Sequence, residues 1–265
     1  MERYVSMSGA PMHGKRAPAV CAMLAILLGA GLSPALAADA APAPLTLSMS
    51  GDAKSFGNRW SMLIYSEAFK RLRQAFRIEY FPSARRAAQA DAQGIGDAGR
   101  IIDYGREHPT LVRVEEAIFD LTFALYTGKA GLRIDTLEQL RTSGVSGEYR
   151  RGVLFCKTKL DAALPSPAAD VSSEILAVKN LSAGLVDVYC EADLVFNEAL
   201  TAPESSGITN VRKLCDIGAL PIYPYLPRSH ASLAPRLAAT LKAMKAEGLV
   251  DAYRRGLEQA AGSGH

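Results

Sequence analysis

Residues 118–127 read IFDLTFALYT, a run rich in apolar, aromatic and β-branched side chains. Such a run is typical of a buried strand, and the glycine-containing segment at 128–131 ends it. We expect it to be the longest extended segment of the chain. Shorter strand and helix patterns alternate on both sides, so this strand is predicted to cross from one half of the fold to the other.

The half that precedes the crossing strand has the order β-α-β-α-β. Ser83 is a suitable N-cap for the second of its helices. This order is typical of a parallel sheet covered by helices. Strands are predicted at 45–49, 77–80 and 95–102, and helices at 58–76 and 82–94.

The half that follows the crossing strand also alternates strands and helices. Strands are predicted at 145–155 and 185–190, helices at 136–140, 172–183 and 191–200, a returning extended segment at 216–226 and a last helix at 232–245. Two segments therefore connect two α/β lobes. Such connections act as hinges, and clefts between lobes are where small ligands usually bind.

These patterns predict an α/β chain of two lobes with two hinge-crossing segments. The first part of lobe 1 is expected at 45–124 and lobe 2 at 125–218. The return segment and the C-terminal helices, residues 219–265, are expected to pack on lobe 1.

The first 37 residues have the three parts of a secretory signal peptide. Basic residues precede an apolar run at 17–32, and Ala35-Leu36-Ala37 offers the small residues that a signal peptidase needs. The run is shorter than the ~20 residues of a membrane-spanning helix. We therefore expect cleavage after Ala37, a flexible leader at 38–44, and a periplasmic protein that is not inserted in the membrane.

The balance of charges indicates which partners the chain favours. The chain has 30 basic and 27 acidic residues, and the signal peptide contains three of the former and one of the latter. That balance favours neither nucleic acid nor a membrane surface, and we expect a monomer.

Three cysteines follow the signal peptide. A disulfide between Cys190 and Cys215 would stabilise the fold by ~3 kcal/mol, the alternative being three buried thiols, Cys156 included.

Motifs of common enzymes are missing from the sequence. The histidines lack metal-binding spacing, and no nucleophile elbow or phosphate-binding loop is found. We therefore expect a non-enzymatic protein that needs no cofactor or metal.

The sequence contains, in this order, the segments 60–72, 82–86 (PSARR), 94–100 (GIGDAGR), 108–114 (HPTLVRV) and 185–191 (LVDVYCE). Taken together, these segments resemble the extracellular solute-binding proteins of family three, in particular a divergent and largely uncharacterised branch. The resemblance covers residues 45–253 and implies a type II periplasmic-binding fold. The segment 145–152 lacks the Gly-Thr element of the amino-acid binders, so the resemblance implies no particular ligand.

Two arginines are candidate ligand-binding residues. Arg85 falls in the first turn of a predicted helix, where a bound anion would offset its repulsion by the helix dipole. Arg100 follows the third strand, at the edge where open α/β sheets bind ligands. The alternatives are a surface arginine for Arg85 and an ion pair with Asp97 or Asp103 for Arg100.

Three further candidates stand beside predicted strands. Trp60 could stack on a ligand at the start of the first helix, and Tyr126 ends the crossing strand. Glu191 follows a strand of lobe 2 and could accept an ammonium group. Packing in the core is the alternative for the aromatic pair.

The sequence thus predicts a periplasmic protein that captures a small polar molecule, anionic or zwitterionic, for an ABC importer or a membrane sensor. A periplasmic enzyme of the hydro-lyase type on the same scaffold is the first alternative. A scaffold that has no ligand and contacts only a partner protein is the second.

Overall fold

The computed structural model describes residues 44–262. The predicted signal peptide and the leader as far as residue 43 lie outside the described residues. Among the helices of the described part, none has the length and apolar character needed to cross a membrane.

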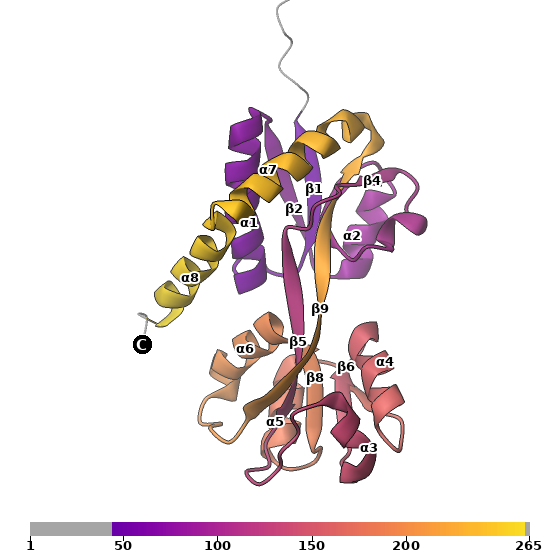
Figure 1. Cartoon of the computed structure of the whole chain (residues 1–265), viewed down its shortest axis with the longest axis vertical. Coiled ribbons are helices and arrows are strands. Elements are labelled where there is room, and N and C mark those ends of the chain that lie inside the picture. Colours follow the sequence, from indigo (N-terminus) through magenta and orange to yellow (C-terminus); the bar gives the residue numbers. More distant parts are fainter. Residues whose placement is uncertain (1–43, 263–265) are drawn as a thin grey trace, which may run out of the picture. The chain divides into compact units, whose positions relative to one another are not determined.

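The described chain forms two α/β lobes (Figure 1). Lobe 1 contains β1 (Leu45–Ser50), α1 (Phe56–Leu72), β2 (Phe76–Phe81), α2 (Ala84–Asp91), β3 (Gly96–Arg100), β4 (Leu111–Arg113), α7 (Ala234–Ala246) and α8 (Leu249–Gly262). Lobe 2 contains α3 (Leu140–Ser143), β6 (Gly147–Arg150), α4 (Leu154–Ala163), β7 (Ala169–Val171), α5 (Glu174–Ser182), β8 (Val188–Ala192) and α6 (Asp193–Thr201). The strands β5 (Phe119–Thr127) and β9 (Arg212–Pro227) run through both.

The described strands form one continuous sheet in the order β2-β1-β3-β9-β5-β8-β6-β7, with β4 paired to β9. β1 is parallel to β2 and β3, and β6 is parallel to β7 and β8. β5 and β9 pair antiparallel between these two parallel halves. The predicted two-lobed α/β architecture with two crossing segments is confirmed, whereas the exact lobe boundaries stay a prediction.

Each lobe has its own apolar core. In lobe 1, β1, α1, α7 and α8 all contribute to one buried cluster, with residues such as Leu47, Phe69 and Leu241, all fully buried. In lobe 2, one cluster contains Cys156 and Leu160 of α4, and another contains Phe196 of α6. The covered strands therefore hold their carboxyl ends in fixed positions, as a ligand site between lobes requires.

Three predicted elements differ from the structure. The longest strand is β9, with 16 residues against nine for β5, because β9 also pairs with strands of lobe 1. The first helix ends at Leu72, since Arg73 takes a left-handed conformation and Phe76 begins β2. The strand predicted at 145–155 ends at Arg150, and Gly152, with φ of +93°, leads into α4.

The disulfide joins Cys156 of α4 to Cys190 of β8, so the predicted pairing of Cys190 with Cys215 is wrong. The sheet register gives the reason. Leu125 of β5 pairs with Cys190 on one side and with Cys215 of β9 on the other. These two cysteines are therefore two strand spacings apart, ~10 Å, which is beyond the ~7 Å between Cα atoms that a disulfide can span.

A buried polar cluster ties β3 to its neighbours at the carboxyl end of the lobe 1 sheet. Arg100 Nε donates a hydrogen bond of 2.6 Å to Asp97, which is 2% exposed. Ser48 Oγ donates to Asp91 at 2.7 Å and to Asp97 at 3.3 Å, and Tyr104 donates to Asp91. Burial raises the pKa of Asp97 to about 7, against the opposing effect of Arg100.

The pairing of the cysteines can be tested by unfolding. We expect the Cys156→Ala/Cys190→Ala double variant to lose ~4 kcal/mol of unfolding free energy, because the native bond spans 34 residues of sequence. Urea denaturation of the oxidised protein measures this loss. Cys215→Ala is the control and should cost much less, since Cys215 is a free thiol. Equal losses for the two proteins would contradict the pairing.

The raised pKa of Asp97 predicts a dependence of stability on pH. Between its ordinary value of 3.8 and about 7, the folded chain holds a proton that the unfolded chain has released. The resulting stabilisation is present below pH ~4 and is lost as the pH rises through ~7. Urea unfolding at two pH values should therefore show a flatter profile for Asp97→Asn, by ~2 kcal/mol from pH ~5 to ~7. The exposed Asp103→Asn should keep the native slope, and an equal slope in all three proteins would refute the assignment.

Candidate functional site

A cleft of about 810 Å³ lies between the lobes and is lined by residues of both. Lobe 1 contributes the carboxyl ends of β1 and β3 and the first turns of α1 and α2. Lobe 2 contributes the turn between β6 and α4 and the first turns of α5 and α6. Ligands of open α/β sheets bind at this edge, where strand ends and helix N-termini converge.

The lobe 1 wall is a turn held by its own side chains. Gly51, with φ of +88°, allows the chain to leave β1 sharply. Asn58 Nδ2 then donates to the carbonyl oxygens of Ser50, at 3.0 Å, and Asp52, at 2.9 Å. Ser55 caps α1 by accepting a hydrogen bond from the backbone nitrogen of Asn58. The wall is therefore rigid before any ligand is present.

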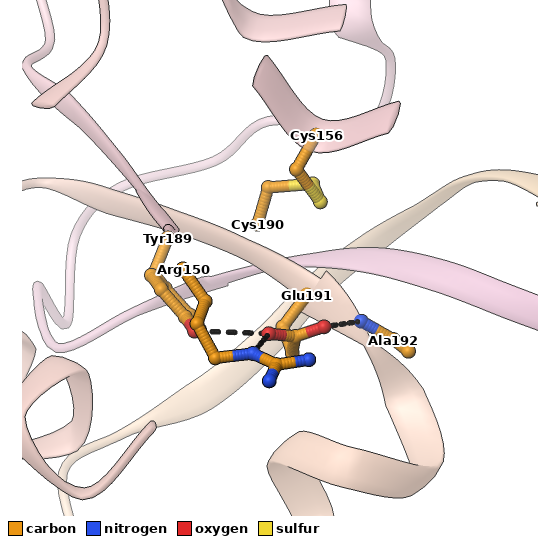
Figure 2. Close-up of a disulfide and its surroundings, with 6 residues drawn as sticks. All are labelled: Arg150, Cys156, Tyr189, Cys190, Glu191 and Ala192. Carbon is orange, nitrogen blue, oxygen red and sulfur yellow. Dashed lines mark hydrogen bonds and ion pairs between the residues drawn. A yellow bond between two sulfur atoms is a disulfide. The ribbon is translucent and has the colours of Figure 1, made fainter. Parts of the chain in front are cut away.

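Arg150 ends β6 and is the best-positioned cation of the lobe 2 wall. Its Nε donates to Glu191 at 2.8 Å (Figure 2). The same nitrogen lies 3.0 Å from a carboxylate oxygen of Glu174. Arg150 is 35% exposed, and neither terminal nitrogen of its guanidinium donates a hydrogen bond within residues 44–262. The inner edge of the guanidinium is thus fixed, and its outer nitrogens are available to a ligand.

Glu191 is the buried anchor of this arginine. It is 1% exposed and also accepts hydrogen bonds from Tyr189 Oη, at 3.2 Å, and from the nitrogen of Ala192, at 2.8 Å. Burial raises the pKa of Glu191, and the charge of Arg150 opposes that shift. A buried carboxylate with three donors is costly to leave unpaired, so it holds Arg150 in place.

The disulfide lies directly behind this cluster. Cys190 immediately precedes Glu191 on β8, and Cys156 belongs to α4, the helix that begins after the turn at Gly152. Figure 2 shows the disulfide and the Arg150–Glu191 pair on opposite sides of the strand. The bond therefore joins the two segments that carry the lobe 2 wall.

Charges of both signs line the cleft. Arg85 lies in the first turn of α2, is exposed, and makes no hydrogen bond or ion pair with any described residue. Arg151 is paired with Asp170. The acidic side chains in the lining are Asp52, Asp97, Glu174 and Glu198. In the described part of the chain, no group of histidine, cysteine and acidic residues could hold a metal ion.

The structure brings some of the predicted site residues to this cleft and places others behind it. Arg85 lines it, and Glu191 reaches it through Arg150. Arg100 is in the ion pair with Asp97, the alternative that the sequence allowed, and also lies 4.7 Å from the ring of Tyr104. It is absent from the cleft lining.

The two predicted aromatic residues lie in the cores. Trp60 is 3% exposed, stacks on Phe119 at 4.2 Å between ring centroids, and donates to the carbonyl oxygen of Val250. Phe119 faces the cleft, so Trp60 supports the wall from behind. Tyr126 is 1% exposed and donates to Asp193 inside lobe 2.

Sequence reasoning missed Arg150, Glu174 and Glu198. Arg150 lies inside the strand predicted at 145–155, so the prediction did not recognise it as the end of a strand. A strand that ends in Arg-Arg-Gly before a helix would have marked the turn, since Gly152 supplies the left-handed conformation. For the two glutamates, no local signal exists.

No protein-family model matches the chain. An uncharacterized protein of Shewanella oneidensis is 28% identical over 226 residues, which cover 84% of this chain and 85% of the relative.

Solved structures share the fold at low identity. A histidine kinase sensor domain with similarity to periplasmic binding proteins has a TM-score of 0.61 at 13% identity, covering 81% of this chain and 96% of that one. An ancestral arginine-binding protein bound to arginine has 0.59 at 13%, covering 82% and 99%. A structure described as a "probable amino-acid ABC transporter extracellular-binding protein" of Bacillus subtilis has 0.63 at 13%, covering 79% and 96%. The chain therefore has the two-lobed fold of the periplasmic solute-binding proteins.

Proposed function

We propose that this protein is a periplasmic solute-binding protein that captures a small anionic or zwitterionic molecule in the cleft between its lobes. Arg150 is the observation that carries the proposal. Its Nε is anchored by two carboxylates, and its outer nitrogens face a cleft lined by both lobes. A guanidinium held in this way matches the two oxygens of a carboxylate.

Arg85 supplies a second cation from the opposite lobe. A ligand that contacts both arginines would bind the closed arrangement better than the open one, because only closure brings them to the same molecule. Glu174 and Asp52 line the same space and suit an ammonium group on the ligand. The mixture of charges favours a zwitterion or a small organic acid over a neutral sugar.

The binding proteins among the solved relatives support this class of function. Those named for arginine and for amino-acid transport have the same fold, and a third is a sensor domain. By analogy, the bound form of this protein would be recognised by an ABC importer or by a membrane sensor. The signal-peptide pattern of the first 37 residues supports a periplasmic location.

A ligand panel tests the proposal directly. Thermal unfolding should be measured with amino acids, organic acids, polyamines and sugars. A true ligand at a hundredfold excess over its dissociation constant adds ~2.7 kcal/mol of stability. The single tryptophan gives a second readout, since Trp60 stacks on Phe119 in the cleft wall. Absence of any shift with acids and amino acids, alongside a shift with neutral sugars, would contradict the proposed ligand class.

Substitution of Arg150 tests the site itself. We expect Arg150→Ala to weaken binding of the ligand found in the panel by about 10- to 150-fold, the loss of hydrogen bonds to a charged group. Isothermal titration calorimetry measures the change. Arg141→Ala, an exposed arginine of the same lobe, is the matched control and should bind like the native protein. Unchanged affinity in Arg150→Ala would move the ligand elsewhere in the cleft.

A further inference from the structure

One carboxylate of lobe 2 caps a helix of lobe 1. Glu198 of α6 accepts a hydrogen bond from the backbone nitrogen of Phe56, the first residue of α1. The first N–H groups of a helix have no partner within the helix, and the positive end of the helix dipole attracts a carboxylate. α1 has no acidic residue in its own first turn. Glu198 thus provides from the other lobe what the sequence of α1 lacks.

A second contact supports the cap. Leu194 lies one helical turn before Glu198, on the same face of α6, and packs against the apolar core of lobe 1. The other face of α6 belongs to lobe 2, where Phe196 and Ala199 are buried. Figure 1 shows α6 next to the end of α1 that faces lobe 2. One helix is therefore shared by the two lobes.

These contacts join parts of the chain that can separate. The covalent connections between the lobes are the segments of β5 and β9, and their pairing is irregular between Phe123 and Ala124, where β5 begins to pair with β8 of lobe 2. Gly218, opposite Phe123, has φ of +140°. Such irregularities bend a strand pair locally and are where a hinge can form. Opening of the cleft at this hinge would remove Glu198 from α1.

We propose that α6 is a latch, in which Glu198 and Leu194 hold the lobes together when no ligand is bound. The latch uses a group of the chain itself at a position where a ligand anion could otherwise bind, at the N-terminus of α1. A ligand then completes a closure that the latch has begun. A larger closed population in the free protein raises the apparent affinity, because less of the binding free energy is spent on closing.

Scattering from the ligand-free protein tests the latch without any ligand. We expect the radius of gyration of the native protein to match the closed arrangement and that of Glu198→Ala to be larger. Loss of one charged helix cap should lower the ratio of closed to open molecules by about fivefold to tenfold. Glu198→Gln keeps an acceptor oxygen without the charge and should lie between the two. Glu204→Ala removes an exposed glutamate of the same lobe and should scatter like the native protein.

Amide hydrogen exchange gives an independent measurement. The N–H of Phe56 should exchange faster in Glu198→Ala, whereas the core amides of each lobe should keep their protection if both remain folded. Identical scattering profiles for the native protein and Glu198→Ala, or an open native protein, would overturn the latch. Because no ligand is used, neither result bears on whether the cleft binds one.

Discussion

The antiparallel pairing of β5 with β9 is the constraint on which the rest of the structure depends. These strands lie in the middle of the continuous sheet, with the parallel strands of lobe 1 on one side and those of lobe 2 on the other. Parallel strands need helical crossovers, and each crossover returns the chain to the same edge of the sheet. The carboxyl ends of both half-sheets thereby come to face one cleft. Without the central pair, neither wall would have an opposing wall.

Buried carboxylates determine which arginines are available to the cleft. Glu191 and Asp97 are almost completely buried, and each holds an arginine, Arg150 in lobe 2 and Arg100 in lobe 1. The two arginines differ in their exposure because of where they lie. Arg100 is turned inward against Tyr104, whereas Arg150 remains partly exposed in the cleft wall. The same type of arginine–carboxylate contact therefore lies inside the fold in one lobe and prepares a binding surface in the other.

Local signals in the sequence were sufficient for most of the fold. Ser83 caps α2 as predicted, and α1 and α7 overlap the helices predicted at 58–76 and 232–245. These local signals failed where the same residue types occur in both strands and helices. Val153 and Phe155 are of types that favour strands, so the predicted strand extends to residue 155, although packing in the lobe 2 core places Phe155 in the helix α4.

The site was harder to predict than the fold because its contacts are distant in the sequence. Glu191 is 41 residues from Arg150, and Glu198 is 142 residues from Phe56. Strand register between β6 and β8 brings Arg150 near Glu191, and register follows from the whole sheet. Helix packing decides the other pairs, since Glu198 and Phe56 lie in α6 and α1 and Cys156 lies in α4. Arg85 could be predicted as a candidate ligand-binding residue because a helix that starts beside a strand end is a local sequence pattern. Arg150 has the same kind of position but lay inside a misassigned element.

The core of lobe 1 is assembled from both ends of the described chain. Leu45 of β1 and Leu257 of α8 belong to the same buried cluster, and β9 pairs with β3. During synthesis, lobe 1 therefore cannot acquire its native core until the residues of α8 have left the ribosome, whereas the residues of lobe 2 between β5 and β9 emerge earlier. Contacts of such long sequence separation also form slowly. The first strands of lobe 1 therefore remain without their native partners until the helices that cover them have been made.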